Sequence, residues 1–331
     1  MKPKRIYYEP DVINYELGKK LMEKYKDVPC IKIESHNRIE ELQKRSNADF
    51  VEMKKYLIIG LRKTHKYVPN KKSSDFLVPY TSSGCSAMCM YCYLVCNYNK
   101  CSYLRLFVNV EQMLMNLIKK SHKTEQLCTF EIGSNSDLIL ENQITGNLDK
   151  TIEEFGEQGR GFITFPTKFS MVDSLLNLKH NGKTIVRMSL NPQEVITKVE
   201  YGTSSLEKRI KAINKLADSG YKIGILIAPV IFVDNWTDLY LQLLNQMKEK
   251  LSDKVKKNLM IEIIFMTYSY VHNAINEEAF PDSIKLYNKE IMTGRGMGKY
   301  WYKKEYREKA ENFFREEIKK RFDSAEIMYI V

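Results

Sequence analysis

Apolar runs of strand length alternate with amphipathic stretches along the middle of the chain. Strands are predicted at 76–80, 126–133, 161–165, 184–190, 222–231 and 259–265, where the residues are apolar and rich in β-branched side chains. Apolar residues at helical spacing predict helices over 110–122, 147–156, 170–180, 205–219 and 236–250. The fourth helix has clear end signals, because Ser204 or Ser205 can cap it, Glu207 lies in its first turn and Gly220 ends it.

This alternation predicts an α/β fold with a parallel sheet, because each parallel pairing needs a crossover connection. The nearly continuous apolar strands indicate burial on both faces of the sheet. The pattern fits an open doubly wound sheet and a curved, barrel-like sheet equally well. In both, functional groups lie at the carboxyl ends of the strands.

The two ends of the chain depart from the repeat, so we predict three segments. Residues 1–74 form an N-terminal α/β extension that closes in the basic stretch RKTHKYVPNKKSS, which is typical of a solvated linker. Residues 75–266 carry the repeat. Residues 267–331 contain GRGMGKYWYKK, a charged helix from about 304 to 321 and a final strand, AEIMYIV.

Composition and charge narrow the class of protein. The 331 residues are 44% hydrophobic, and no stretch approaches the roughly 18 uninterrupted apolar residues of a membrane span. The start, MKPKRIYYEP, lacks the apolar region of a secretion signal, so we expect a cytoplasmic protein with no membrane association. The formal charge of +11 favours a polyanionic partner, but a lysine-rich surface also serves solubility.

Five of the seven cysteines lie in one loop, SSGCSAMCMYCYLVCNYNKC, from 82 to 101. An odd number of cysteines crowded into one loop predicts metal or redox chemistry rather than a secreted disulfide framework. Cys85, Cys89 and Cys92 have the spacing C-x3-C-x2-C. Zinc sites usually have four protein ligands, and no second pair lies nearby. Three thiolates suit a 4Fe-4S cluster with one open iron, while a zinc or redox-silent cysteine cluster is the alternative.

The loop, with an aromatic residue before its third cysteine, resembles the radical S-adenosylmethionine superfamily. That resemblance implies a partial (β/α)6 TIM-type barrel whose cluster motif follows the first strand. It also implies that S-adenosylmethionine chelates the open iron and is cleaved to a 5′-deoxyadenosyl radical.

Further stretches over about residues 55–331 resemble one family of this superfamily, the spore photoproduct lyases. They are LIIGLRKT, SSGCxxxCxYCYL, LRLFVN, FEIGSNSD, TKFSMVDSLLNLKHNGKTIVRMSLNP, GTSSLEKRIKAINKLADSGY, IGILIAPV and GRGMGKYWY. The resemblance implies a sporulation-related DNA repair lyase that reverses the thymine dimer called spore photoproduct without light. It also implies DNA containing that lesion as partner and an electron donor such as flavodoxin or ferredoxin, and we expect a monomer.

The same resemblance gives roles to individual residues. Tyr91 and Tyr93 match tyrosines that return a hydrogen atom to 5′-deoxyadenosine. Four residues match positions that hold S-adenosylmethionine: Ser136, Lys168, Ser189 and Ala228. Taken alone, these four would be interpreted as capping serines, a surface lysine and a core alanine.

The match fails at one position. The family has a cysteine that donates a hydrogen atom to the thymine-methyl radical, where this chain reads Glu131-Ile-Gly-Ser134-Asn-Ser136-Asp137. The O–H bond of Ser134 is too strong for that donation. Either the activity is lost or altered, or another cysteine has taken over. Cys96 is our candidate because it lies three residues after Tyr93. Cys101 follows, then Cys128 on the second strand, and Cys30 is predicted to be an ordinary buried thiol.

The segment GRGMGKYWY resembles a β-hairpin that enters DNA near the lesion. By this resemblance Arg295 and Lys299 contact phosphates and Tyr300 stacks where a base leaves the duplex. A charged surface hairpin without a DNA role is the alternative. Two other functions stay open at this point: a radical S-adenosylmethionine enzyme acting on RNA, peptide or a small molecule, and a non-catalytic metal-stabilised nucleic-acid-binding protein.

Overall fold

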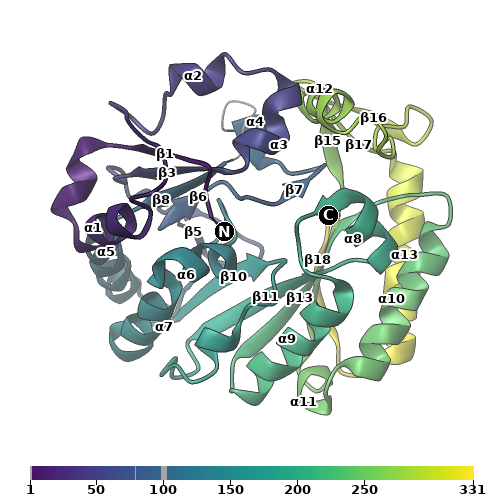
Figure 1. Cartoon of the computed structure of the whole chain (residues 1–331). Helices are drawn as coiled ribbons and strands as arrows, with labels where there is room; N and C mark the ends of the chain where they lie inside the picture. Colours follow the sequence, from purple (N-terminus) through teal and green to yellow (C-terminus); the bar gives the residue numbers. More distant parts are fainter. Residues whose placement is uncertain (1, 79, 98–102) are drawn as a thin grey trace. The chain divides into compact units, whose positions relative to one another are not determined.

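The computed structural model describes residues 2–78, 80–97 and 103–331, without the side chains of residues 96 and 97 (Figure 1). The chain forms two compact units. Unit 1 comprises Met1–Met88, Tyr93–Phe165 and Asp173–Thr184, and unit 2 comprises Cys89–Cys92, Pro166–Val172 and Ile185–Val331. These units cut across the three predicted segments, whose boundaries stay a prediction.

Unit 1 contains a five-stranded sheet built largely from the N-terminal extension. Its order is β2 (Cys30–Lys32), β1 (Arg5–Tyr8), β3 (Tyr56–Gly60), β8 (Leu104–Phe107) and β6 (Ser82–Ser83). All pairings are parallel except that of β6 with β8. β1 and β3 are apolar on both faces: Ile6 and Leu57 lie on one face and Tyr7 and Ile58 on the other, and none of the four has exposed surface. That burial explains why these short strands are stable in the middle of the sheet.

A second set of unit 1 strands has the order β10 (Phe162–Thr167), β9 (Thr129–Glu131), β5 (Phe76–Leu77) and β4 (Val68–Pro69). The last two residues of β10 belong to unit 2. The longer helices of this unit are α1 (Glu16–Lys24), α5 (Val110–Lys123), α6 (Leu138–Thr145) and α7 (Asn147–Gln158). The short ones are α2 (Glu40–Gln43), α3 (Phe50–Met53), α4 (Leu94–Asn97) and the 3-10 turns η1 (Pro10–Asn14), η2 (Asn47–Asp49) and η3 (Asp173–Leu175).

Unit 2 is built on parallel strands in the order β18 (Glu326–Ile330), β14 (Met260–Phe265), β13 (Lys222–Val230) and β11 (Thr184–Leu190). Its helices are α8 (Gln193–Val199), α9 (Leu206–Asp218), α10 (Trp236–Lys250), α11 (Asp253–Lys256) and α13 (Lys304–Arg321). Helices α10 and α13 run side by side (Figure 1), with the Tyr240 and Phe314 rings 5.5 Å apart. Two short strands are β7 (Met88–Cys89) and β12 (Glu200–Tyr201).

A small antiparallel sheet completes unit 2, and it contains the predicted hairpin, which is confirmed. Its order is β15 (Thr267–Ser269), β17 (Lys299–Tyr302) and β16 (Met292–Gly296), and α12 (Tyr270–Ala279) follows β15. The turn needs glycine at 298, because φ is +67° there and a Cβ would lie 2.2 Å from the Tyr270 ring.

Most predicted elements are present, and the exceptions have physical causes. The predicted helix over 170–180 is wrong: only η3 forms, and this one turn is enough to bury Leu175. The chain then turns at Asn181 and Gly182, which both have positive φ. Helix α6 was not predicted, and the predicted strand at 76–80 is shortened to Phe76–Leu77.

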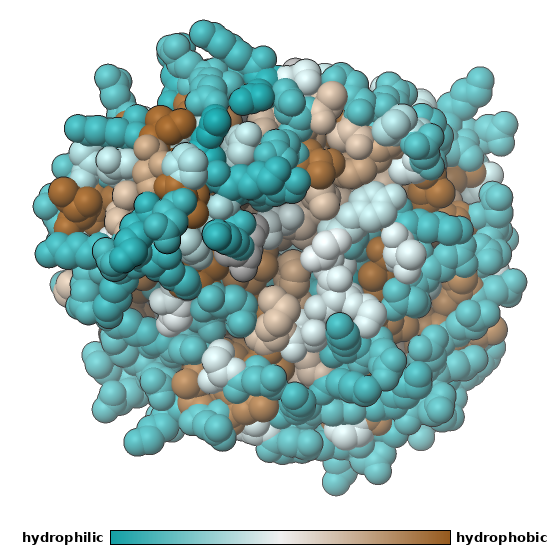
Figure 2. Space-filling view, in the orientation of Figure 1, coloured by the Kyte–Doolittle hydropathy of each residue, from teal (hydrophilic) through white to brown (hydrophobic). Residues whose placement is uncertain are grey.

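The surface shown in Figure 2 is covered mostly by hydrophilic residues, with apolar residues in scattered groups. Within the part of the chain that the structure describes, none of the helices is both long enough and apolar enough for a membrane span.

Candidate functional site

Cys85, the first of the three cysteines expected to hold a cluster, lies in unit 1 in a loop held by backbone contacts. The Ala87 N–H donates to the Cys85 sulfur over 3.3 Å, and Lys54 Nζ donates to the Cys85 carbonyl over 2.7 Å. Gly84 donates its N–H to the Asn135 carbonyl over 2.8 Å with φ at +81°. An N–H that points at sulfur favours the thiolate form, which is the form that binds metal.

Cys89 and Cys92 belong to unit 2, where side chains of α12 fix the backbone of their loop. Asn276 donates to the Met90 carbonyl over 2.8 Å, and Met90 donates its N–H to Val199 over 3.0 Å. His272 Nε2 is 3.1 Å from the Cys92 carbonyl and must donate, because a carbonyl only accepts. Burial lowers the pKa of His272 to about 4, so the ring is neutral at pH 7.

The chemistry of this donor set fits an iron-sulfur cluster with three protein ligands. The three thiols are partly exposed, and none is in a disulfide among the described residues. Across the described ranges, no three His, Cys, Asp or Glu side chains are gathered as a preformed metal site. Soft thiolates on a loop with anchored backbone, one of them accepting an N–H, are the ligands that iron-sulfur clusters take.

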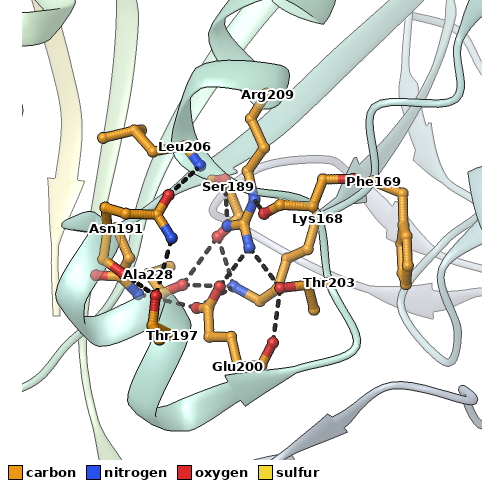
Figure 3. A network of polar contacts seen from close by, with 12 residues as sticks. Lys168, Phe169, Ser189, Asn191, Thr197, Glu200, Thr203, Leu206, Arg209 and Ala228 are labelled. Carbon is orange, nitrogen blue, oxygen red and sulfur yellow. Dashed lines mark hydrogen bonds and ion pairs between the residues drawn. The ribbon is translucent and has the colours of Figure 1, made fainter.

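Three of the four residues predicted to hold S-adenosylmethionine meet in unit 2, around the ammonium of Lys168 (Figure 3). Lys168 Nζ donates to Ser189 Oγ over 2.6 Å and to the Ala228 carbonyl over 2.8 Å. Ser189 Oγ also donates to the Ala228 carbonyl over 2.9 Å. These residues come from the carboxyl ends of β10, β11 and β13, as the pattern of strands predicted.

The third acceptor of Lys168 is Glu200, a carboxylate that sequence reasoning missed. Glu200 Oε1 is 3.1 Å from Lys168 Nζ, and Oε2 accepts from Arg209 over 2.6 Å. Only 1% of Glu200 and none of Arg209 is exposed. Burial alone would raise the pKa of Glu200, but Lys168 and Arg209 more than offset it and lower the pKa to about 2.

Tyr91 points its phenol at the same carboxylate. Its hydroxyl donates to Glu200 Oε1, which also accepts from Asn191 over 3.0 Å. The Lys168 ammonium lies 5.6 Å from the centre of the Tyr91 ring. Burial and the Glu200 charge raise the pKa of Tyr91 well above its usual value, so the phenol keeps its proton at pH 7.

Tyr93 and Ser136 lie in unit 1. Half of Tyr93 is exposed, and its hydroxyl donates to the carbonyl of Ser134, the position where the sequence departs from the resemblance. Ser136 Oγ is 2.5 Å from Ser82 Oγ. Asp137 caps α6, as its oxygen accepts from two N–H groups of the first turn.

Behind Ser82 lies a second buried carboxylate that the sequence did not reveal, Glu141 on α6. Its Oε2 accepts from Thr81 over 2.8 Å and from Ser82 over 3.1 Å, and its Oε1 accepts from Asn147 over 2.8 Å and from Thr145 over 3.1 Å. All four donors are neutral. Burial therefore dominates and raises the pKa of Glu141.

The hairpin presents an apolar residue at its tip. Met297 lies between Gly296 and Gly298 and is 94% exposed. Arg295 lies on β16 with its guanidinium 4.8 Å from the centre of the Trp301 ring. Tyr300 packs on Tyr287, with the ring centres 4.6 Å apart. Lys299 is exposed at the start of β17.

The candidate hydrogen donors fall largely outside the described residues. Cys96 lies in α4, but its side chain is not described, and Cys101 is not described at all. Cys128 lies one residue before the start of β9 rather than within that strand, and it is partly exposed. The prediction of a buried Cys30 is wrong: this residue is exposed because β2 is the edge strand of its sheet.

A signal for the missed ion pair was present in the sequence. Leu206, Ile210 and Ile213 mark the buried face of α9, and Arg209 lies on that face. A charged residue at a core-facing position predicts a buried partner. Nothing in the sequence identified Glu200 as that partner.

Comparisons with known proteins agree over the whole chain. The family model described as spore photoproduct lyase matches residues 1–331. The spore photoproduct lyase of Bacillus subtilis (strain 168) is 32% identical over 335 residues, covering 99% of this chain and 98% of the relative. That of Clostridium acetobutylicum (strain ATCC 824) is 31% identical over 337 residues with the same coverage.

Solved structures of spore photoproduct lyase are equally similar. One is complexed with dinucleoside spore photoproduct, and a variant holds bound AdoMet together with dinucleoside spore photoproduct. Each has a TM-score of 0.91, 30% identity and 99% coverage of both chains. The predicted α/β fold class, a partial (β/α)6 barrel, is thereby confirmed. This chain belongs to the spore photoproduct lyase family.

Proposed function

We propose that this protein is a DNA repair lyase that reverses the spore photoproduct thymine dimer to two thymines by a 5′-deoxyadenosyl radical mechanism. The observation that carries the proposal is full-length similarity to structures that hold AdoMet and dinucleoside spore photoproduct. The C-x3-C-x2-C loop and the polar residues around Lys168 supply the groups that such a reaction needs.

Cys85, Cys89 and Cys92 would hold the 4Fe-4S cluster, and Ser136, Lys168, Ser189 and Ala228 would hold S-adenosylmethionine. When bound, the two cofactors supply the radical that begins repair. The Lys168 ammonium suits the carboxylate of the methionine part, since it is oriented by Ser189 and Ala228 before any ligand arrives.

Tyr91 and Tyr93 would return hydrogen after repair. Each phenol gives up its O–H hydrogen atom to become a phenoxyl radical and takes one hydrogen atom back. Both hydroxyls have a defined acceptor in this structure, Glu200 for Tyr91 and the Ser134 carbonyl for Tyr93. Fixed O–H directions favour transfer along one route.

Cys96 is our proposed hydrogen donor, in place of the cysteine that Ser134 replaces. Substitution Cys96→Ala should leave lesion cleavage intact but give trapped side products instead of clean thymine. Cys30→Ala is the matched control, because Cys30 is an exposed thiol on an edge strand. Clean thymine from Cys96→Ala would make Cys101 and then Cys128 the candidates.

The hairpin would contact DNA, because a radical formed inside the protein cannot reach a stacked base and the lesion must leave the duplex. Arg295, Lys299 and Tyr300 supply the charged and aromatic contacts. Met297 at the tip adds an apolar side chain of the kind that inserts between base steps.

The role of the hairpin is tested by comparing substrates. Met297→Ala should reduce repair of a lesion in duplex DNA by about tenfold, as expected from a lost wedge contact of about 1–2 kcal/mol, and leave dinucleoside repair unchanged. Met115→Ala is the control, because Met115 is 50% exposed on α5. An equal loss on both substrates would contradict a DNA-wedge role.

We further propose a monomeric, cytoplasmic protein that acts in sporulating cells and receives its electron from flavodoxin or ferredoxin. The activity itself is tested with anaerobically reconstituted protein and dinucleoside spore photoproduct. Thymine release with S-adenosylmethionine is the expected result. Reductive cleavage of S-adenosylmethionine without thymine release would favour another radical enzyme, acting on RNA, peptide or a small molecule, which is the function that Ser134 supports.

A further inference from the structure

One oxygen of Glu200 serves a candidate ligand-binding residue and a candidate radical-path residue together. Glu200 Oε1 accepts from Lys168 Nζ over 3.1 Å and from Asn191 over 3.0 Å (Figure 3). The same oxygen accepts from the Tyr91 hydroxyl. Arg209 bonds the other oxygen. A carboxylate oxygen has about two lone-pair directions, so three donors on Oε1 compete with one another.

The Lys168 ammonium is equally crowded. It has three N–H groups, and their acceptors are Ser189 Oγ at 2.6 Å, the Ala228 carbonyl at 2.8 Å and Glu200 Oε1 at 3.1 Å. A ligand carboxylate must displace one of them. The Glu200 contact is the longest, and its charge would repel the incoming carboxylate. Arg209 stays on Glu200, so that carboxylate can release the ammonium and still have a cationic partner.

We propose that Glu200 is a positioning residue that couples ligand binding at Lys168 to the hydrogen bond of Tyr91. A carboxylate-bearing ligand draws Lys168 away from Oε1, and the Tyr91 hydroxyl then becomes the principal donor to that oxygen. The enzyme thus fixes the Tyr91 phenol most firmly when the ligand is present. This inference rests on the proposed function, because it takes S-adenosylmethionine as the ligand.

If ligand binding strengthens the hydrogen bond of Tyr91, then that hydrogen bond must in turn strengthen ligand binding. The proposal can therefore be tested by measuring affinity, without enzymatic turnover. Without the Tyr91 hydroxyl, Glu200 depends more on Lys168 and resists losing it. Tyr91→Phe should therefore weaken binding of S-adenosylhomocysteine to cluster-loaded protein by about fivefold, the low end of typical couplings. Binding of 5′-methylthioadenosine, which lacks the carboxylate, should not change. Anaerobic isothermal titration calorimetry measures both.

A double-mutant cycle separates Glu200 from other causes. In a Glu200→Gln background, Tyr91→Phe should have no further effect on S-adenosylhomocysteine affinity. The chain offers a matched control in Glu262, a buried carboxylate that also accepts from an arginine, Arg187 at 3.0 Å, and from a phenol, Tyr329 at 2.5 Å. In a Glu262→Gln background, the effect of Tyr91→Phe should persist in full.

A second measurement covers the case in which Glu200→Gln does not fold. Ligand-induced infrared difference spectra of protein with ring-labelled tyrosine report the phenol C–O stretch, and Tyr91→Phe identifies the band. S-adenosylhomocysteine should shift that band toward a stronger hydrogen bond, and 5′-methylthioadenosine should not. The proposal is overturned if both ligands shift it equally, if neither does, or if the affinity effect survives in Glu200→Gln. None of these outcomes depends on whether spore photoproduct is repaired.

Discussion

Two buried glutamates, one in each unit, differ in their hydrogen-bond donors: one has only neutral donors, and the other has cationic donors as well. Glu141 in unit 1 has no exposed surface and four neutral donors. Glu200 in unit 2 is 1% exposed and is bonded by Lys168 and Arg209 as well as neutral groups. Burial pushes the pKa of both upward, but only Glu141 keeps a raised pKa, whereas that of Glu200 falls to about 2. The charge of the donors, not their number, decides the direction in which the pKa of the carboxyl group moves.

The two glutamates also differ in how their surroundings can respond to a ligand. Glu141 ties Thr81 and Ser82 to α6 and α7 through neutral donors, none of which is an ammonium that a ligand would attract. Glu200 holds one ammonium that an anionic ligand can attract. A buried carboxyl group that lies beside such an ammonium responds to the ligand, whereas one held only by neutral donors has no cation for the ligand to attract.

The largest expected effect comes from removing the charge of Glu200. Glu200→Gln should lower the free energy of unfolding by about 3–5 kcal/mol, because it leaves the buried Arg209 and the half-buried Lys168 without a counter-charge. Urea unfolding of the cluster-free protein measures it, with Glu207→Gln on the exposed side of α9 as control. A loss under about 1 kcal/mol would mean that solvent reaches this network.

Removing Arg209, the ion-pair partner of Glu200, should then restore part of the lost stability. Arg209→Met added to Glu200→Gln should recover about 2 kcal/mol or more, because an apolar side chain of similar length carries no unpaired charge. The same urea transitions report it. If the double variant is less stable than Glu200→Gln alone, the backbone acceptors of Arg209, the carbonyls of Ser189 and Ser204, matter more than the ion pair.

The two carboxylates should differ in the sign of their pH dependence. The pKa of Glu200 is lowered from 4.5, so its stabilisation is present above pH 4.5 and is lost as pH falls toward about 2. The deficit of Glu200→Gln should therefore shrink between about pH 5 and about pH 3. A deficit that stays constant over that range would show that Glu200 is not held as a carboxylate.

The smallest effect is expected at Glu141. Glu141→Gln should cost about 1 kcal/mol, because an amide can still bond Asn147 and rotating hydroxyls. The pKa of Glu141 is raised, so its stabilisation is present below pH 4.5 and is lost as pH rises through the folded-state pKa. The deficit of Glu141→Gln should thus shrink as pH rises, opposite to that of Glu200→Gln. Parallel slopes would contradict the comparison.

The features that were predicted correctly from the sequence are set by residues that lie close together in the chain. β11 and α10 have the predicted bounds, because their apolar spacing is a local property. The cysteine motif is local too, since its eight residues carry their own signal. The predicted helix over 170–180 failed because Leu175 is buried by a single turn, and periodicity cannot measure how much helix the core requires.

The polar network was not predictable in the same way. Tyr91, Lys168, Glu200 and Arg209 come from four separate stretches, and their contacts exist only after unit 2 has folded. The resemblance supplied Lys168 and Tyr91 as isolated positions. It said nothing of the acid between them, because a buried acid is recognised by its partners and not by its neighbours in sequence.

Helix α12 links two parts of unit 2 that are far apart in the sequence. At one end Tyr270 donates its N–H to Gly298 in the hairpin turn, and further along His272 and Asn276 bond the carbonyls of Cys92 and Met90. Helix α12 therefore contacts both the loop that carries Cys89 and Cys92 and the hairpin with Met297 at its tip. A substitution that displaces α12 would therefore disturb the hairpin turn and the sulfur-bearing loop together.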